Sequence, residues 1–276
     1  GSKFDAIITP TVPWLPKLLS CIDCYHWIHF LSAGIDKIWE MEFDKETSLL
    51  TKSSGVHGPP MSEYAIGAML YFAKQFGRFK EQGDNRLWQR MWLDELTRKK
   101  LAILGLGSVG QAIAIRAKSF DMEVWGISRH LRPVSHVDKV MSMHDLRDNV
   151  SQVDYLVICL PLTHDTRNLI DEEFLKSLKK NAVLVNISRG GVVSEKALIN
   201  ALDSGCLKGV ALDVFDEQPL SSDSPLWGRS NVLLTPHVSG TTPYYLKRAL
   251  KIFIRNAKCI ELGESPITPV NVLAGY

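Results

Sequence analysis

The sequence lacks the features that mark membrane proteins and nucleic-acid-binding proteins. No apolar run reaches the roughly 18 residues that a membrane-spanning helix needs, and no secretory signal opens the chain. The 32 basic and 30 acidic residues nearly balance, so charge gives no reason to expect nucleic acid or an anionic membrane as a partner. We therefore expect a cytoplasmic protein, and 276 residues suffice for one large domain or two modest ones.

Cysteine is scarce and shows no pairing pattern. The five cysteines are an odd number scattered through apolar segments: Cys21, Cys24, Cys159, Cys206 and Cys259. Cys21 and Cys24 have the C-x-x-C spacing, but no second pair completes a closed zinc site. The sequence thus predicts free thiols and no bound metal.

From residue 99 onward, short apolar runs alternate with amphipathic stretches. Each run is continuously rich in Val, Ile and Leu, which is typical of a strand covered on both faces. The runs are KLAILGLG, MEVWGIS, YLVICLP, AVLVNIS, GVALDVF and NVLLTPH. The helix-like stretches between them are SVGQAIAIRAKSF, DEEFLKSLKK and SEKALINALDSG. This alternation predicts an α/β fold with a doubly wound parallel sheet.

Both ends of the chain are less regular than this centre. FDAIITP is typical of a strand, and MSEYAIGAMLYFAKQFGRF of a long helix that Ser62 would cap. TPYYLKRALKIFIRNAKCIELG predicts a C-terminal amphipathic helix. We predict a central domain over residues 57–240 and a smaller, split, flavodoxin-like domain built from residues 1–56 and 241–276.

The first apolar run of the centre ends in a glycine pattern. ILGLGSVG places Gly105, Gly107 and Gly110 in the G-x-G-x-x-G spacing. Gly105 would allow a tight turn, Gly107 would let the backbone approach a pyrophosphate, and Gly110 would let the next helix pack closely on the strand. A glycine-rich turn without a ligand is the alternative. Because the motif leaves a predicted strand and opens a predicted helix, we expect a Rossmann domain that binds a dinucleotide.

The end of the next strand bears on which dinucleotide is bound. An acidic residue there would accept a hydrogen bond from the ribose 2′-hydroxyl of NAD. The sequence WGISRHLRP instead places Ser128 and Arg129 there, with His130 and Arg132 close behind. Arg129 can pair with a 2′-phosphate, so we expect NADP(H) as the preferred cofactor, with NAD(H) as the alternative. These basic residues would otherwise form only a solvated loop.

Three further motifs follow successive strands, at the edge where doubly wound sheets bind ligands. They are VNISRGG with Arg189, LDVFDEQPL, and LLTPHVSG with His237. An arginine can hold a carboxylate and polarise a carbonyl, and a histidine can donate the proton when that carbonyl receives a hydride. Taken singly, Arg189 could be a surface ion pair and His237 a structural histidine. Together, at strand ends beside a nucleotide fold, they predict an oxidoreductase.

With these motifs the sequence resembles the D-2-hydroxyacid dehydrogenase family over nearly its whole length. The matching segments include LSAGIDKI, GVHGPPMSEYAIGAMLYFAK, LAILGLGSVGQAIA, CLPLTHDTRNLI, VNISRGGVVSEKALINAL, GVALDVFDEQPL and LTPHVSGTT. GVHGPPMSEY and DSPLW look most like the NADPH-dependent glyoxylate/hydroxypyruvate reductases. The resemblance implies reduction of a small 2-keto acid to the D-2-hydroxy acid. It also implies a chain shortened at its N-terminus, because the first strand-helix unit of the small domain has no counterpart here.

The resemblance implies roles for individual residues. Arg189 and His237 would be catalytic, and the backbone amides of Ala33 and Gly34 in the small domain would bind the substrate carboxylate. Beyond the glycines and the Ser128–His130 corner, the residues expected at the cofactor are Ser108, Val109, Leu160, Pro161, Thr163, Ile187, Ser188, Asp213, His237 and Gly240. A homodimer formed through the YAIGAML helix region is implied in the same way. Trp14, Trp39, Trp227 and Tyr245 either line the substrate pocket or belong to the core or an interface.

The sequence departs from the family at the residue expected to pair with His237. The family places a glutamate immediately before the proline of DVFxxEP, but here that position is Gln218. Glu217 is one residue early and should point the other way in extended backbone. A carboxylate would favour the protonated imidazole, whereas an amide can orient the ring but adds no charge. We therefore expect a reductase that works best at lower pH, or a weakened one.

Two other functions stay open at this point. Formate dehydrogenases of the same family carry Gln-Pro here, and hydride removal from formate needs no proton transfer. Against this alternative, GVHGPP lacks the asparagine of those enzymes, and Ser128 replaces the acid of their NAD-using members. The second alternative is a non-catalytic nucleotide sensor or corepressor-like protein, which Gln218 and the short N-terminus would permit.

Overall fold

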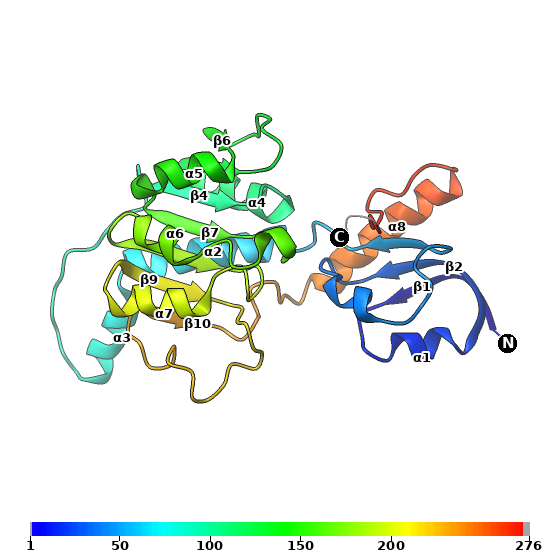
Figure 1. Ribbon diagram of the computed structural model, residues 1–276, viewed down its shortest axis with the longest axis horizontal. Coiled ribbons are helices and arrows are strands. Elements are labelled where there is room, and N and C mark those ends of the chain that lie inside the picture. The colour runs from blue at the N-terminus through cyan, green and yellow to red at the C-terminus, as the bar shows by residue number, and fades with distance from the viewer. Residues whose placement is uncertain (1, 273–276) are drawn as a thin grey trace. The chain divides into compact units, whose positions relative to one another are not determined.

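The computed structural model describes residues 2–272, in which the chain divides into two compact units. Unit 1 comprises Gly1–His57 and Thr241–Tyr276, and unit 2 comprises Gly58–Gly240 (Figure 1). Across residues 2–272, no helix is long and apolar enough to cross a membrane. The five cysteines are all free thiols, as predicted.

Unit 2 is built on a seven-stranded, fully parallel sheet. Its strands are β4 (Lys100–Leu104), β5 (Glu123–Ile127), β6 (Lys139–Met141), β7 (Tyr155–Ile158), β8 (Ala182–Asn186), β9 (Leu207–Leu212) and β10 (Val232–Leu234). The spatial order is β10-β9-β8-β7-β4-β5-β6, so the direction of winding reverses between β4 and β7. This is the Rossmann order with one extra strand, and it confirms the doubly wound parallel sheet.

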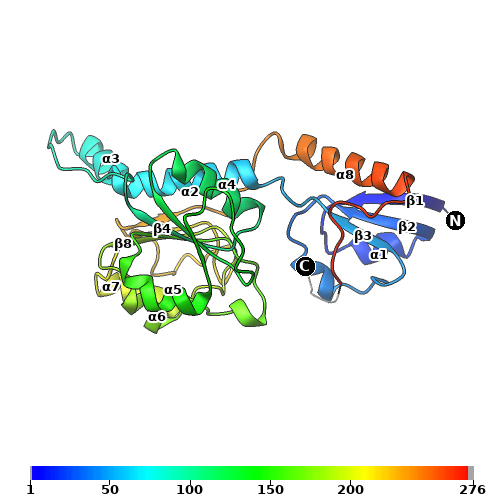
Figure 2. The ribbon, with the colours of Figure 1, turned by 90° about the horizontal axis from the view of Figure 1, so that it is seen from above.

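Helices cover both faces of this sheet, as Figure 2 shows. On one face lie α2 (Gly58–Ala73) and α4 (Ser108–Lys118). On the other face lie α5 (Met143–Asn149), α6 (Glu172–Ser177) and α7 (Glu195–Asp203), with short 3-10 turns at η2 (Val150–Gln152) and η3 (His164–Thr166). Because both faces are covered, β7 and β8 are buried throughout and β4 from its second residue, which explains their continuous apolar runs.

The predicted cap at Ser62 is wrong. The helix begins four residues earlier, at Gly58, with two prolines in its first turn, where a missing N–H leaves no hydrogen bond unmade. Ser62 therefore lies inside α2, and its hydroxyl donates to the carbonyls of Gly58 and Pro59. The helix ends near Ala73, because Gln75 adopts a left-handed backbone conformation, and the chain continues as α3 (Phe76–Asp84).

Unit 1 contains a three-stranded parallel sheet in the order β1-β2-β3. Its elements are β1 (Ser2–Thr9), α1 (Leu15–Leu19), β2 (Ile22–Phe30), η1 (Asp36–Glu40), β3 (Leu49–Lys52) and α8 (Tyr245–Glu261). Helices α1 and α8 cover opposite faces of this sheet (Figure 2). Alternate residues of β2 face them in turn: Ile28 and Phe30 pack with α1, whereas Trp27 and His29 contact Phe253 of α8.

A buried polar group lies under α8. His29 has no exposed surface, and its ring nitrogens lie 2.7 Å from Thr51 Oγ1 and 3.1 Å from Ser53 Oγ. The indole N–H of Trp27 donates to the same Thr51 hydroxyl, and the Trp27 ring stacks on Phe253. Burial lowers the pKa of His29 to about 4, so the imidazole is neutral at pH 7 and its hydrogen bonds to Thr51 and Ser53 join neutral groups.

This pKa predicts a pH-dependent stability of unit 1. Between about pH 6.5 and 4, the unfolded chain binds a proton at His29 that the folded unit excludes. The free energy of unfolding should therefore fall as pH falls through this window, by up to roughly 3 kcal/mol. Amide hydrogen exchange of β2, followed by mass spectrometry, should show this loss of protection. His29→Gln should flatten the pH dependence, and the exposed His26→Gln should leave it unchanged; equal slopes in the two variants would refute the assignment.

Candidate active site

The glycine loop lies where the strand order reverses. Gly105 directly follows β4 and has φ of +100°, which favours glycine. A side chain on Gly110 would lie 1.9 Å from the Gly105 carbonyl oxygen, so only glycine lets α4 start this close to the loop. A side chain on Gly107 would meet no protein atom within 4 Å, which leaves room beside the first turn of α4 for a diphosphate. The loop therefore fits a dinucleotide.

The segment after β7 forms the other wall of this crevice. The carbonyl oxygen of Cys159 lies 3.1 Å from where a side chain on Gly105 would begin, and Leu160 is equally close. The Cys159 thiol donates to the carbonyls of Leu104 and Gly105, and burial raises its pKa to about 12. This thiol is thus a structural group and not a nucleophile.

An ion pair marks the end of β5. The Arg129 guanidinium contacts the Asp165 carboxylate at 2.9 Å, which links the loop after β5 to η3 after β7. Both side chains are about two-thirds exposed, at 67% and 70%, so the pair contributes little to stability. Ser128 is half-buried, and His130 and Arg132 are exposed. The corner therefore holds two arginines and a histidine, with the Asp165 carboxylate bound to one of the arginines.

The loop after β8 carries Arg189 and is held against the loop after β9. A side chain on Gly190 would lie 2.0 Å from the Phe215 carbonyl oxygen, so the two backbones meet directly. The N–H of Gly191 donates to the Asp216 carboxylate, which ties the loops together. Arg189 is half-buried, and its Nη1 donates to the Ser188 carbonyl at 2.8 Å.

Several carboxylates lie near the contact between the loops after β8 and β9. Burial, followed by the charges of Asp216 and Glu217, raises the pKa of Glu195 at the start of α7. Asp216 is already engaged with Gly191, and Glu217 is exposed. The side chain that meets Nδ1 of the histidine is the next one along the chain, Gln218.

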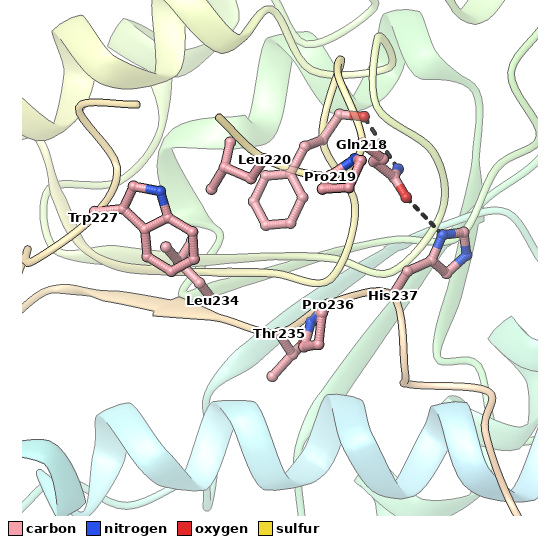
Figure 3. A pocket seen from close by; sticks show the side chains of 9 residues that line it. Gln218, Pro219, Leu220, Trp227, Leu234, Thr235, Pro236 and His237 are labelled. Carbon is pink, nitrogen blue, oxygen red and sulfur yellow. Dashed lines mark hydrogen bonds between the residues drawn. The ribbon is translucent and has the colours of Figure 1, made fainter. Parts of the chain in front are cut away.

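The partner of His237 is Gln218. The Gln218 Oε1 atom lies 2.9 Å from His237 Nδ1, and the Gln218 Nε2 atom donates to the Phe215 carbonyl at 3.2 Å (Figure 3). The Phe215 carbonyl can only accept, so the amide must direct its nitrogen there and its oxygen toward the ring. His237 Nδ1 is therefore the donor, and in the neutral ring Nε2 is the unprotonated nitrogen, which can take up a proton and release it.

A buried carboxylate holds the loop that carries His237. Asp213 has no exposed surface and accepts hydrogen bonds from the Thr235 hydroxyl at 2.6 Å and from the N–H groups of Val238 and Ser239 at 2.8 Å. The Tyr64 hydroxyl of α2 donates in turn to Thr235, and burial, with the nearby Asp213 charge adding to it, raises the pKa of Tyr64 to about 12.

At the tip of this loop His237 is exposed and has φ of +55°. A non-glycine residue in the left-handed region persists only where its surroundings enforce it, and such residues concentrate at functional sites. The hydrogen bonds to Asp213 on both sides of the tip enforce it here.

An apolar cavity of about 560 Å³ opens beside this pair. Figure 3 shows His237 and Gln218 toward one end and Trp227 toward the other. The lining residues, here called the His237 pocket, are Phe215, Gln218, Pro219, Leu220, Trp227, Leu234, Thr235, Pro236 and His237.

Comparison with known proteins decides the family of the chain. Residues 66–239 match the family model described as D-isomer specific 2-hydroxyacid dehydrogenase, NAD binding domain. A glyoxylate reductase from Thermofilum pendens is 34% identical over 277 residues, which cover 98% of this chain and 78% of the relative. The chain belongs to the D-2-hydroxyacid dehydrogenase family.

Solved structures agree with this membership. A D-2-hydroxyacid dehydrogenase from Xanthobacter autotrophicus Py2, in complex with NADPH and MES, superposes with a TM-score of 0.88 at 28% identity and covers 99% of this chain and 85% of its own. An NADPH-dependent glyoxylate/hydroxypyruvate reductase from Sinorhizobium meliloti, in complex with NADP and sulfate, superposes with a TM-score of 0.89 at 26% identity. The match covers 100% of this chain and 87% of the reductase. In both cases the likeness extends over nearly all of this chain.

The structure brings most of the sequence-predicted residues of this family member to the strand ends of unit 2. Ser108 and Val109 open α4, Pro161 and Thr163 follow β7, and Ile187 and Ser188 follow β8. Gly240 ends the loop that begins after β10. Ala33 and Gly34 lie in unit 1, where the carbonyl of the preceding Ser32 accepts from the N–H of Ser53.

Three features of this dehydrogenase were not foreseen from the sequence. Asp213 was expected at the cofactor, but in the structure both of its oxygens hold the His237 loop. Asp165 was not singled out, although an acid within LTHDTR after a predicted strand could have suggested a partner for Arg129. The apolar side chains of the His237 pocket come from separate loops, and their gathering has no signal in local sequence.

The Asp213 network predicts a large effect of its removal. Asp213→Ala would leave the Thr235 hydroxyl and two backbone N–H groups without an acceptor, so unit 2 should lose roughly 2–4 kcal/mol of unfolding free energy. Hydrogen exchange at Val238 and Ser239 should accelerate. Asp223→Ala, at an exposed position of the same region, should change stability by less than about 0.5 kcal/mol. Unchanged exchange at Val238 and Ser239 in Asp213→Ala would contradict the positioning role.

Proposed function

We propose that this chain is an oxidoreductase that transfers a hydride from NADPH to a small 2-keto acid of the glyoxylate or hydroxypyruvate kind, giving the D-2-hydroxy acid. The observation that carries the proposal is the oriented His237–Gln218 pair, set at the strand ends of a Rossmann sheet beside the Arg189 loop. The names of the glyoxylate reductase from Thermofilum pendens and the NADPH-dependent enzyme from Sinorhizobium meliloti support it.

On the substrate side, the Arg189 guanidinium binds the carboxylate of the keto acid and polarises its carbonyl. In unit 1, the backbone amides of Ala33 and Gly34 are the proposed substrate-binding groups. Unit 2 thus acts as the dinucleotide-binding domain and unit 1 as the substrate domain.

The proton comes from His237. NADPH, when bound, supplies the hydride that attacks the carbonyl carbon, so the carbonyl oxygen gains negative charge and needs a proton. Because Nδ1 donates to Gln218, the protonated ring delivers its Nε2 proton to that oxygen and is left as the neutral Nδ1–H form. The hydride on the carbon and the proton on the oxygen together convert the carbonyl group into the alcohol.

NADP(H) is the preferred cofactor, and NAD(H) is the weaker one. The diphosphate would be held by Gly105, Gly107 and Gly110 and by the start of α4, at Ser108 and Val109. Ser128, Arg129 and His130 bind the 2′-phosphate. The remainder of the dinucleotide would be held by Leu160, Pro161, Thr163, Ile187, Ser188 and Gly240, and Asp213 would contribute through the loop that it holds.

The direct test is oxidation of NADPH and NADH with glyoxylate and with hydroxypyruvate, for the wild type and for His237→Ala. We expect turnover with NADPH that the His237 variant reduces at least about 100-fold. Reduction of NAD(P)⁺ by formate, with no turnover of keto acids, would favour the formate-dehydrogenase alternative. Tight NADPH binding without turnover of any of these substrates would favour the nucleotide sensor.

The neutral partner of His237 predicts a particular pH profile. Reductase activity should fall as pH rises, because Gln218 adds no charge to favour the protonated ring. Gln218→Glu restores a carboxylate at the same atom, so its profile should extend to higher pH. The matched control is Glu217→Gln, one residue away and exposed, which should leave the profile in place. An identical profile for wild type and Gln218→Glu would show that the pair does not control the proton.

The Arg129–Asp165 pair predicts an effect on cofactor choice. Arg129→Ala should reduce the preference for NADPH over NADH at least about tenfold, because a charged hydrogen-bonded partner of the 2′-phosphate is lost. Asp165→Asn removes a carboxylate that forms an ion pair with Arg129 and would repel the 2′-phosphate. In this variant KM for NADPH should therefore fall, while KM for NADH stays the same. If neither variant changed the ratio of KM for NADPH to KM for NADH, the 2′-phosphate would have to bind elsewhere.

We also propose that the enzyme works in the cytoplasm and as a homodimer. The near balance of charge and the family support these statements, and the α2 region, which contains YAIGAML, is the proposed contact. Sedimentation of the purified protein tests the homodimer.

A further inference from the structure

Arg248, on α8 of unit 1, has a buried nitrogen that makes no hydrogen bond within the chain. The residue as a whole is half-buried, and its Nη1 atom is buried with no hydrogen-bond partner among residues 2–272. The N–H groups of a guanidinium can only donate. Buried donors in folded proteins nearly always have an acceptor, which can belong to a bound ion or molecule. Nη1 is therefore placed to donate to a ligand.

The position of Arg248 in its helix also favours an anion as that ligand. Arg248 lies in the first turn of α8, which contains no acidic residue. The helix dipole makes this end of a helix favourable for negative charge and unfavourable for a cation. The guanidinium carbon lies 5.8 Å from the centre of the Tyr244 ring. Because that ring is exposed, the cation–π contact stabilises the charge only weakly.

The guanidinium lies at the end of α8 that is bound to the segment after β2. Helical side chains lean toward the N-terminus, and the contact of Arg248 with Tyr244, four residues earlier, fits this direction. In the same turn, the Tyr245 hydroxyl donates to the Leu31 carbonyl, and the Tyr245 ring lies 5.3 Å from the ring of His57. The start of α8 is thus in direct contact with the residue that follows β2.

The same segment leads into the proposed substrate-binding amides of Ala33 and Gly34. The preceding residue, Ser32, is held from two sides. Its carbonyl accepts from the N–H of Ser53 at 3.3 Å, and its hydroxyl lies 3.1 Å from the hydroxyl of Thr11. Thr11 and Ser53 follow β1 and β3, so the loop is fixed against the ends of the neighbouring strands. Unit 1 therefore holds the two amides and the Arg248 guanidinium on elements that are bound to each other.

We propose that Arg248 binds a second carboxylate of the substrate, so that the preferred substrates are 2-keto dicarboxylic acids. This rests on the proposed function, in which the first carboxylate is assigned to Arg189 and to the amides of Ala33 and Gly34. A guanidinium pairs with a carboxylate through two parallel hydrogen bonds, with specific geometry. The distal carboxylate would supply the acceptor for Nη1 and would balance a cation at the start of α8.

Calorimetric titration with two keto acids of equal chain length tests the binding. The probes are 2-ketoglutarate, which has a second carboxylate, and 2-ketovalerate, which lacks it, each with and without NADP⁺. The wild type should bind 2-ketoglutarate at least about tenfold more tightly, and Arg248→Met should abolish this difference. Arg255→Met, at an exposed arginine of the same helix, should preserve it. Equal binding of the two acids by the wild type, no binding of either, or an undiminished preference in Arg248→Met would overturn the proposal.

Thermal unfolding separates a binding role of Arg248 from a structural one. Replacing an unpaired buried charge by an apolar side chain removes an unfavourable group, so the midpoint of Arg248→Met without ligand should not fall below that of the wild type. The upward shift that 2-ketoglutarate gives the wild type should be lost in the variant. A lower midpoint without ligand, or a shift that persists in the variant, would assign Arg248 to the structure of unit 1 and refute the proposal.

Turnover distinguishes this proposal from the proposed reaction. Arg248→Met should raise KM for 2-ketoglutarate at least about tenfold and leave KM and kcat for glyoxylate unchanged, because glyoxylate has a single carboxylate. Equal losses with both substrates would contradict a role in binding the second carboxylate. If no keto acid were reduced, the proposed reaction would fail, whereas a preference for 2-ketoglutarate in the titration would still support the role of Arg248.

Discussion

The chemistry assigned to this chain depends on one uncharged hydrogen bond, between the side-chain amide of Gln218 and the ring of His237. The Phe215 carbonyl accepts from the amide nitrogen and so directs the amide oxygen toward the imidazole. The amide thereby orients the ring and adds no charge of its own. A glutamate would orient the ring and also favour its protonated form. The glutamine of this chain orients the ring but adds no charge that favours protonation.

The site also depends on how a doubly wound sheet ends. The glycine loop, the Arg189 loop, Gln218 and His237 follow four different strands, and parallel strands bring their ends to one edge. Two contacts hold the loops in register: the direct approach of Gly190 to Phe215, and the buried Asp213 carboxylate beneath the His237 loop. A left-handed backbone at His237 is tolerated because Asp213 holds the residues on either side.

Much of unit 2 could be predicted from sequence because its signals are local. The strands appear as continuous apolar runs because both faces of the sheet are buried. The spacing of Gly105, Gly107 and Gly110 reflects contacts between residues that are close in the sequence. The strand β6 was missed because it has only three residues and its outer end is exposed. Ser62 was taken for a cap because two prolines concealed the earlier helix start.

Features that depend on contacts between distant residues escaped prediction. The sequence does not show that Asp213 meets residues 25 and 26 positions later, or that Arg129 meets Asp165. On α8, Leu246, Leu250 and Ile254 look like a core-facing stripe, yet they are exposed, because Tyr245, Ala249 and Phe253 occupy the side toward the sheet. The full exposure of Trp88 and Trp92, which follow α3, is likewise apparent only from the structure.

The central claim is that Gln218 holds His237 with Nδ1 as the donor and Nε2 as the nitrogen that exchanges the proton. Long-range proton–nitrogen correlation spectra of nitrogen-labelled protein report the protonated nitrogen of each of the eight histidines, and His237→Gln identifies the relevant signal. We predict an Nδ1–H tautomer in the neutral state, with Nε2 titrating. A neutral ring protonated at Nε2 would contradict the account, because the Gln218 oxygen would then face an acceptor.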